Sequence, residues 1–395
     1  MTKLIFPYAN NNAQPIRIIE EYTDYGFIDE HGNDLIDLSL GNCGCFPIGF
    51  DRKDIIKTVA DNMRDIPFCS GEFYTTNHAV IELSERLYNL SGGYRSVFAL
   101  SGSDAIEGAV RLAQVYNGRN KFLGFRKSYH GSTYMSSSIS DATYMTDLYG
   151  KDPRCVISDY TLDNITDDLC AVVIETASWQ NGLYDPGQEF WQGLRKKCTD
   201  KDIVLIVDDI AMCGGKTGTF FGWQGVVEPD IFTMGKALTS GYFPLSATLV
   251  NEKIFDVVKH NVFCHGFSYS FSLSGIYSTL AYLDIIENEK LFESYPKILG
   301  WATNTFIRFK EHGLIKDFNN HGLVFNLTLL SDKPVDASFE KFLYDYGISA
   351  GMWNEGGTGL LIIVPLNADA MWFEELEYRL APALNKYASI TAVTN

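Results

Sequence analysis

The chain has 395 residues, of which 46% are apolar and 14% aromatic, so it can form packed cores and is not dominated by disorder. Its 32 Lys and Arg against 49 Asp and Glu give a formal net charge of −17. This charge repels phosphate backbones, and no basic run exceeds Arg195-Lys196-Lys197, so we expect small-molecule partners and no nucleic-acid binding.

The positions of the cysteines and histidines and the lengths of the apolar runs exclude further classes of protein. The eight cysteines are scattered, with one C-x-C at Cys43 and Cys45, and the seven histidines do not cluster beside them. We therefore expect no metal site and reduced thiols. The first residues lack the apolar core of a signal peptide, and the apolar runs are far too short to span a membrane. We expect a cytoplasmic protein with no membrane attachment.

From about residue 75 to 260, short apolar runs alternate with longer amphipathic segments. The pattern predicts strands at Val97–Leu100, Lys121–Phe125, Ala171–Glu175, Ile203–Asp208, Ile231–Met234 and Leu245–Val250, and helices at Asp104–Tyr116 and Glu189–Cys198. Such alternation indicates an α/β fold with a mostly parallel central sheet flanked by helices. Ligands in these folds bind at the carboxyl ends of the strands.

After about residue 275 the pattern changes. It predicts helices at Ile276–Asn288, near 297–312 and near 369–387, and strands around 323–330 and 358–364. This combination is typical of a smaller α+β lobe. We therefore predict a large domain over 46–274 and a small domain built from both chain ends, 1–45 plus 275–395.

The segment Ser101-Gly102-Ser103-Asp104 follows an apolar strand and opens a predicted helix. A helix N-terminus presents free N–H groups and a partial positive charge, so Gly102 and Ser103 can bind a phosphate there. The alternative is an ordinary capped turn, because Ser is a favoured cap in any protein.

The strand Ile203–Asp208 runs directly into an acid. A carboxylate at the end of a buried strand points into the ligand crevice, where it can hold a metal, a ribose hydroxyl or a protonated ring nitrogen. A solvated strand end is the alternative. No second acid cluster lies nearby in the sequence, which makes the metal the weakest of the functional choices.

Lys236 follows an apolar strand and lies between Gly235 and Gly241. A lysine desolvated in such a position has a lowered pKa and can act as an amine nucleophile that forms a Schiff base. A phosphate-binding Walker A loop is excluded, because Asp230 and Ala237 stand where that motif requires Gly and Ser or Thr. An exposed lysine without a special role is the alternative.

Tyr129-His130-Gly131 follows the strand Lys121–Phe125. An aromatic side chain beside a glycine can stack on a planar ring, and the alternative is a core aromatic near a turn.

In this order, the four signals resemble the class III pyridoxal-phosphate-dependent aminotransferases. Residues 208–218 (DDIAMCGGKTG) are similar to the family's D-E-x-x-T-G-F-G-R-T-G. Residues 235–241 (GKALTSG) and 245–249 (LSATL) look most like the branch that makes 7,8-diaminopelargonate in biotin biosynthesis. Phe6-Pro7-Tyr8 resembles that branch's H-P-Y. The likeness implies an aspartate-aminotransferase-like large domain that binds pyridoxal 5'-phosphate (PLP).

The resemblance also implies roles at the cofactor. Lys236 would hold PLP as a Schiff base and then move the substrate proton. Asp208 would pair with the pyridinium nitrogen, and Tyr129 would lie over the ring. Gly102 and Ser103 would bind the phosphate.

Further roles follow from the same likeness. Glu175 matches the family's E-P glutamate near the cofactor, with Thr176 in place of the proline. Ser268 in H-G-F-S matches a threonine that contacts the phosphate across a dimer interface, which implies a homodimer. Tyr8 and Phe46 would line the substrate pocket.

Several positions depart from the family. Lys216 replaces an arginine, Ser132 stands where the diaminopelargonate branch usually has an acid, and no arginine occurs between Arg308 and Arg379, where the family clamps a substrate carboxylate. Glu355 in that segment would favour an amine. Either another group holds the carboxylate, or the preferred substrate lacks it. We therefore expect an amine donor and a keto acceptor, with the enzyme acting on an amine that is distant from any carboxylate. Another omega-amine transaminase, an aminomutase on the same fold and a non-catalytic PLP-binding homologue remain alternatives.

Overall fold

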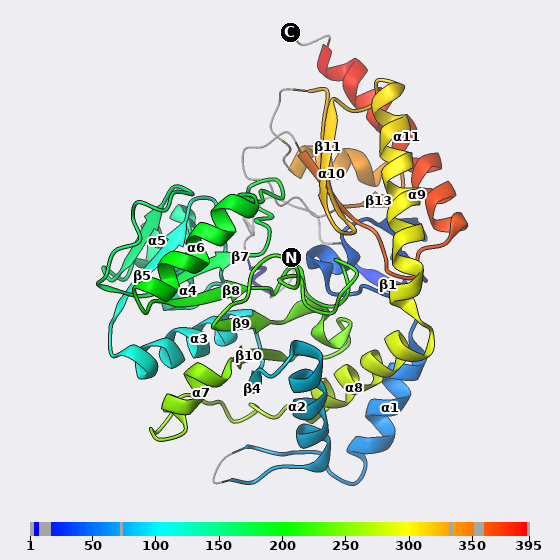
Figure 1. The fold of residues 1–395 in the computed structure, drawn as a ribbon. Coiled ribbons are helices and arrows are strands. Elements are labelled where there is room, and N and C mark those ends of the chain that lie inside the picture. The colour runs from blue at the N-terminus through cyan, green and yellow to red at the C-terminus, as the bar shows by residue number, and fades with distance from the viewer. Residues whose placement is uncertain are drawn as a thin grey trace.

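A computed structural model describes residues 4–7, 17–71, 74–331, 335, 337–350 and 359–392. Its largest unit is a seven-stranded sheet in the order β4-β10-β9-β8-β7-β5-β6 (Figure 1). The strands are β4 (Arg95–Ala99), β5 (Lys121–Phe125), β6 (Cys155–Ser158), β7 (Leu169–Glu175), β8 (Val204–Asp208), β9 (Ile231–Met234) and β10 (Ser246–Val250). The strand pairs from β6 to β9 are parallel, and β10 runs antiparallel to both of its neighbours. The predicted mostly parallel α/β sheet is confirmed.

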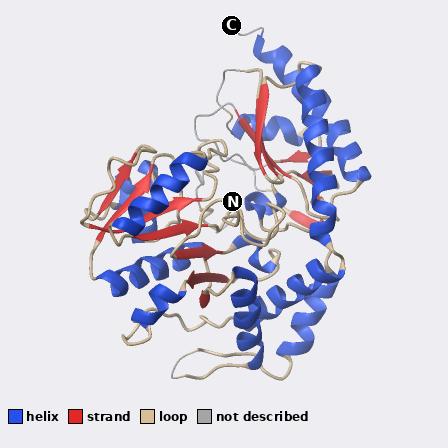
Figure 2. Cartoon of the chain, in the orientation of Figure 1, coloured by secondary structure: helices blue, strands red, loops and turns tan. Residues whose placement is uncertain are grey.

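Helices cover both faces of this sheet, as Figure 2 shows. In β7, Val172 and Ile174 pack into a core that includes α6 (Gln188–Asp200), whereas Ala171 and Val173 pack into a second core with α3 (Gly102–Asn117). Because alternate side chains enter two different cores, the whole strand is apolar and buried. Because helices cover both faces of the sheet, the predicted ligand crevice belongs at the carboxyl ends of its strands.

Two smaller sheets complete the strand architecture. One has the order β1-β2-β3-β13 and the other the order β11-β12-β14. Their strands are β1 (Ile19–Tyr22), β2 (Gly26–Asp29), β3 (Asp34–Asp37), β11 (Asp317–His321), β12 (Val324–Thr328), β13 (Ile348–Ser349) and β14 (Gly359–Ile363). β13 pairs in parallel with β3, so the two ends of the chain share one sheet. This pairing is what the predicted two-ended small domain requires, and its boundaries at 46 and 275 stay a prediction.

The remaining helices lie around these sheets (Figure 1). They are α1 (Lys53–Met63), α2 (His78–Ser91), α4 (Tyr134–Ile139), α5 (Thr143–Tyr149), α7 (Glu252–Val258), α8 (Leu273–Asn288), α9 (Leu291–Glu311), α10 (Ala337–Tyr344) and α11 (Ala370–Ala392), with two short turns, η1 (Leu40–Gly44) and η2 (Lys236–Thr239). α8 is buried along most of its length and packs against α1 and α2.

Several elements were not predicted, and their residues explain why. β1 reads IEEY and is exposed throughout, and β11 reads DFNNH. Neither sequence has the alternation of apolar and polar residues that identifies a half-buried strand. The predicted long strands and helices are present, with ends that differ by a few residues.

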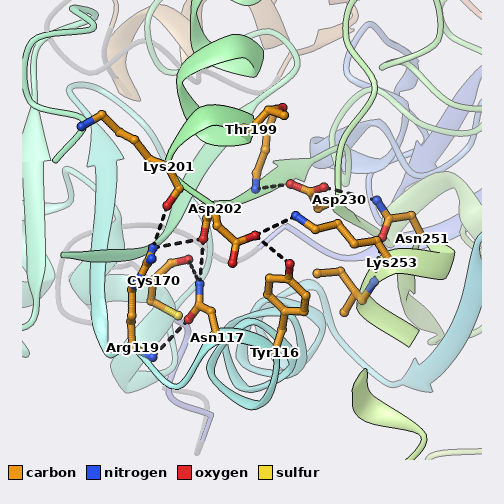
Figure 3. A network of polar contacts seen from close by, with 12 residues as sticks. Tyr116, Asn117, Arg119, Cys170, Thr199, Lys201, Asp202, Asp230, Asn251 and Lys253 are labelled. Atoms are coloured by element: carbon orange, nitrogen blue, oxygen red, sulfur yellow. Dashed lines mark hydrogen bonds and ion pairs between the residues drawn. The ribbon is translucent and has the colours of Figure 1, made fainter. Parts of the chain in front are cut away.

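A polar network joins the end of α3 to neighbouring elements (Figure 3). Asp202, at the start of the chain segment that enters β8, accepts hydrogen bonds from Tyr116 Oη at 2.7 Å and from Lys253 Nζ at 2.9 Å. Arg119 donates to the carbonyls of Leu169 and Lys201 at 3.0 and 3.1 Å. These contacts fix α3, and therefore its N-terminus at the opposite end, against the sheet.

The described residues contain neither a membrane-spanning helix nor a metal-binding cluster. None of the helices in these ranges is long and apolar enough to cross a membrane. No group of three or more His, Cys, Asp or Glu side chains in the same ranges is arranged to hold a metal ion. All eight cysteines are free thiols.

Candidate active site

Three adjacent parallel strands end at one cavity. Glu175 closes β7, Asp208 closes β8, and the two residues pair directly in the strand register. Asp208 pairs in turn with Thr233 on β9, two residues before Gly235. The cavity at this edge has a volume of about 200 Å³. Six predicted site residues line it: Gly102, Ser103, Tyr129, Glu175, Asp208 and Lys236.

The N-terminus of α3 forms one wall of the cavity. Ser101 caps the helix: its Oγ accepts the N–H of Asp104 at 3.2 Å, and Asp104 Oδ2 accepts the Ser101 N–H at 3.1 Å. The N–H groups of the first turn, those of Gly102 and Ser103, have no intrahelical acceptor. The Ser103 Oγ accepts a hydrogen bond from the Ser132 N–H at 3.0 Å. Its own hydroxyl proton can therefore be donated to a ligand.

Gly131 leaves room beside this turn. It has a φ of 132°, and a Cβ at this position would lie 2.4 Å from Ser103 Oγ. Only glycine therefore fits, since a side chain would displace the Ser103 hydroxyl.

Lys236 enters the cavity from the turn that follows β9. Its φ is 43°, a region that a non-glycine residue occupies at a cost of about 1–3 kcal/mol. Its Nζ lies 4.9 Å from the centroid of the Trp179 ring, which also lines the cavity. The strained turn places the half-buried Lys236 in the wall of the cavity at the strand ends.

Asp208 has a buried partner that the sequence did not identify. His130 Nδ1 lies 2.8 Å from Asp208 Oδ2, and the two side chains are 0% and 5% exposed. The two side chains therefore form a buried hydrogen bond. Asp208 Oδ1 accepts from Thr233 Oγ1 at 3.2 Å and from the Ile210 N–H at 3.1 Å. The sequence signal for His130 is its place in Tyr129-His130-Gly131, next to the aromatic residue predicted to lie over the ring.

Glu175 holds the loop that carries Tyr129. Its Oε1 accepts the Tyr129 N–H at 2.9 Å. Burial raises the pKa of Glu175 to about 7, an effect that His130 opposes and Asp208 reinforces. Glu175 therefore carries a proton part of the time near neutral pH.

A second buried acid stands behind Asp208. Asp209 accepts from Thr176 Oγ1 and from the Gly222 N–H, both at 2.8 Å. Burial raises its pKa to about 7, with Lys216 opposing the shift and Asp208 reinforcing it. Thr176, which replaces the family's proline, thus supplies a hydrogen bond to this acid.

Lys216, Arg308 and Arg379 lie at or near the positions where the sequence departs from the family. Each of them binds another group of the protein. Lys216 is buried, and its Nζ donates to the Cys213 carbonyl at 2.8 Å. Burial lowers the pKa of Lys216. Arg308 pairs with Glu377, and Arg379 pairs with Glu375 and with Asp34. Neither arginine lines the cavity.

Two predicted residues, Ser268 and Phe46, are not among the described residues that line the cavity. Ser268 is exposed on the segment between α7 and α8. Phe46 packs against Phe50, with ring centroids 4.6 Å apart. Tyr8 and the segment 351–358, with Glu355, lie outside the described residues.

The groups around the cavity fit one cofactor. The α3 N-terminus and the Ser103 hydroxyl suit a phosphate, Asp208 suits a protonated ring nitrogen, and the Lys236 amine suits an aldehyde. His130 Nε2 is buried and has no hydrogen-bond partner among the described residues, so His130 is committed to Asp208 alone. These are the functional groups of PLP.

Comparison with known proteins decides the family. Residues 8–366 match the model of the class-III aminotransferase family. The chain belongs to the class III aminotransferases. It is 27% identical over 385 residues to an acetylornithine/succinyldiaminopimelate aminotransferase of Buchnera aphidicola, covering 91% of this chain and 90% of the relative. A putrescine–pyruvate aminotransferase of Pseudomonas aeruginosa is 24% identical over 371 residues, covering 84% of this chain and 81% of the relative.

A solved structure agrees on the fold. The taurine:2-oxoglutarate aminotransferase of Bifidobacterium kashiwanohense, in complex with PLP and glutamate, superposes with a TM-score of 0.89 at 21% identity, covering 98% of this chain and 96% of the other. This class III aminotransferase is thus a PLP-dependent transferase that exchanges amino groups between amine and keto compounds. The predicted family, enzyme class and cofactor are confirmed, whereas the diaminopelargonate branch is not specifically supported.

Proposed function

We propose that this aminotransferase works through Lys236, Asp208, Tyr129 and the turn Gly102–Ser103. The observation that carries the proposal is their meeting at one cavity of about 200 Å³. When bound, PLP supplies an aldehyde carbon for the substrate amine and a ring that accepts electrons. Gly102 and Ser103 bind its phosphate, and Tyr129 covers the ring.

The protein's own groups then handle the protons. Asp208 holds a proton at the ring nitrogen, and His130 fixes the Asp208 carboxylate through the 2.8 Å hydrogen bond. The Lys236 amine would hold the cofactor at its aldehyde and, when free, would accept and return the proton of the substrate carbon.

For the substrate, we propose an amine that is distant from any carboxylate. Asp208 and Glu175 line the cavity, and Lys236 is the single Lys or Arg among the described residues that line it. Lys216, Arg308 and Arg379 have the partners described above, and among the described residues no guanidinium lines the cavity for a bidentate carboxylate contact. A diaminopelargonate-type reaction is one example of this class. Aminotransferases of omega-amines such as putrescine are another.

The role of Lys236 is tested by fixing the cofactor with borohydride and mapping the modified peptide. Wild type should carry the cofactor on Lys236 and show amino transfer. Lys236→Ala should lose both, while Lys196→Ala, a change at an exposed lysine paired with Asp200, should keep both. Activity in the Lys236→Ala variant would refute the proposal.

A donor panel tests the substrate class. The PLP-loaded enzyme is mixed with putrescine, S-adenosylmethionine, taurine or glutamate, and conversion of the cofactor to its aminated form is followed by absorbance. Putrescine should react fastest, because its amines are distant from any carboxylate. Fast reaction with S-adenosylmethionine alone, whose amine is next to its carboxylate, would favour the diaminopelargonate type over other omega-amine transaminases. Fast reaction with glutamate alone would overturn the proposal. Turnover of a single substrate without a donor would favour an aminomutase, and cofactor binding without any amino transfer would favour a non-catalytic homologue.

We also propose a homodimer in the cytoplasm, in which Ser268 reaches the phosphate of the partner's site. Its exposure and its absence from the cavity wall of its own chain support this role. A stable, PLP-loaded monomer in sedimentation would contradict the dimer.

A further inference from the structure

The C-x-C pair lies at the end of the turn η1, with Cys43 inside the turn and Cys45 as the residue that follows it. Cys43 Sγ and Cys45 Sγ are 3.1 Å apart, and both side chains are half-buried. A disulfide bond is about 2.05 Å long, so the sulfurs need to approach by about 1 Å. The pair is therefore close to bonding distance while both thiols are free.

Hydrogen bonds to Asp37 fix the start of the turn, whereas the glycine between the two cysteines allows the backbone there to change conformation. Asp37 accepts the N–H groups of Ser39 and Gly41, both at 2.8 Å. Gly44, between the two cysteines, has a φ of 68°. Glycine tolerates both signs of φ, so the Cys-Gly-Cys ring can close without a steric penalty at its central residue.

The electrostatics favour one of the two sulfurs as a nucleophile. The pKa of the Cys43 thiol is lowered by the hydrogen bond with Cys45 and further by the amines of Lys236 and Lys216, against the opposing effect of burial. The pKa of Cys45 is raised by the same hydrogen bond and by burial. The thiolate is the reactive form of cysteine, so Cys43 is the attacking sulfur and Cys45 the resolving one.

The turn also contacts the wall of the active site. A Cβ on Gly44 would lie 2.8 Å from Trp179 Cη2 and 3.2 Å from Lys216 Cε. Trp179 lines the cavity, and its ring is 4.9 Å from Lys236 Nζ. One side chain therefore separates the Cys-Gly-Cys turn from the amine.

We propose that Cys43 and Cys45 form a reversible oxidation site that peroxide converts into an intrachain disulfide. The Cys43 thiolate attacks one peroxide oxygen, the O–O bond breaks, and the departing hydroxide takes up a proton to become water. Cys45 then attacks the resulting sulfenic acid, the S–S bond forms, and the S–O bond breaks. The second hydroxide takes the Cys45 proton and leaves as water. The two thiols lose two electrons in total, and hydrogen peroxide is reduced to two waters.

The disulfide moves Gly44 against Trp179 and slows amino transfer at Lys236. This consequence rests on the proposed role of Lys236, whereas the disulfide itself does not. A dithiol restores the reduced pair by thiol–disulfide exchange.

The test uses the PLP-loaded full chain and peptide mapping. The first lysine or arginine after Arg17 is Arg52, so trypsin releases residues 18–52 as one peptide that contains Cys43 and Cys45 and no other cysteine. After a hydrogen peroxide series, free thiols are alkylated and this peptide is weighed. We expect it to lose both alkylation sites and two hydrogens, and to recover both sites with dithiothreitol. The exposed Cys264 serves as an internal reference.

The outcomes separate the two parts of the proposal. A peptide that stays doubly alkylated at peroxide doses that oxidise Cys264, or that shows Cys43 as sulfinic acid without a disulfide, overturns the oxidation site. In Cys45→Ser, dimedone should label Cys43, because the resolving thiol is missing. Oxidised wild type should lose at least tenfold in amino transfer, reversibly, while the double variant Cys43→Ser/Cys45→Ser resists the same dose. A disulfide with unchanged activity overturns the link to Lys236, and a reduced enzyme that is inactive from the start points to the proposed function instead.

Discussion

Replacing His130 tests whether the buried imidazole positions Asp208. The hydrogen bond from His130 Nδ1 to Asp208 Oδ2 is 2.8 Å long, and both side chains are almost completely buried. A hydrogen bond to a charged group contributes about 1.5–3 kcal/mol, and about 1.4 kcal/mol corresponds to a factor of ten. His130→Leu should therefore weaken PLP binding about 10-fold to 150-fold, because Asp208 loses the partner that aims it at the ring nitrogen.

The assay is a titration of the apo-enzyme with PLP, followed by the change in protein fluorescence and by kcat at saturating cofactor. His130→Asn is the matched variant, since its side-chain amide can donate near the position of Nδ1 and should lose less than about tenfold in affinity. Thermal unfolding of both apo-variants separates misfolding from weaker binding. If His130→Leu binds PLP like wild type and keeps its kcat, the positioning role is refuted.

Three further changes give distinct readouts. Gly131→Ala should weaken PLP binding at least tenfold in the same titration, because its Cβ would lie 2.4 Å from Ser103 Oγ; an unchanged Kd would show that this turn does not bind the phosphate. Asp209 has a pKa raised from 3.8 to about 7, so the folded state keeps a proton that the unfolded state has lost, and wild-type stability should fall between about pH 4 and pH 7. Asp209→Asn should remove on the order of 2–3 kcal/mol of the decrease between pH 5 and pH 8, seen as a smaller change in Tm; parallel Tm profiles would contradict this origin. Ser268→Ala should raise the Kd for PLP several-fold without changing the sedimentation of the dimer, and an unaffected Kd would argue against a contact across the interface.

The strands and the cavity were predictable because their signals are local. The run Ile203–Asp208 is apolar and ends in an acid, which places that acid at a strand end, and the structure confirms β8 with Asp208 as its last residue. Parallel strands share one carboxyl edge, so Glu175 and Asp208 had to meet once both strands were recognised. The antiparallel direction of β10 has no such signal, because a buried strand has the same apolar sequence in either direction.

The contacts that tune the site could not be read from the sequence. His130 and Asp208 are 78 positions apart, and nothing in the Tyr129-His130-Gly131 motif says which side of the turn the imidazole faces. The contacts of Arg308 and Arg379 also have no signal in the sequence, which shows only that no arginine lies between them. Arg308 on α9 pairs with Glu377, and Arg379 on α11 pairs with Glu375 and Asp34, which supports the proposal that neither binds a substrate carboxylate.

The departures from the family pattern are coupled, although they are far apart in the sequence. Asp209 is one methylene shorter than the glutamate of the family motif, and Thr176 replaces the proline after Glu175. A proline at 176 has no hydroxyl, so it could not make the 2.8 Å hydrogen bond that Thr176 Oγ1 donates to Asp209 Oδ1. Lys216, in the arginine position, adds a buried amine whose charge opposes the rise in the Asp209 pKa. Each substitution alone looks like a loss of a family feature, but together they form one buried polar unit behind Asp208. It follows that Thr176→Pro should lower the Tm, because it leaves Asp209 buried with the Gly222 N–H and one donor fewer; an unchanged Tm would show that the Thr176 hydroxyl does not support this unit.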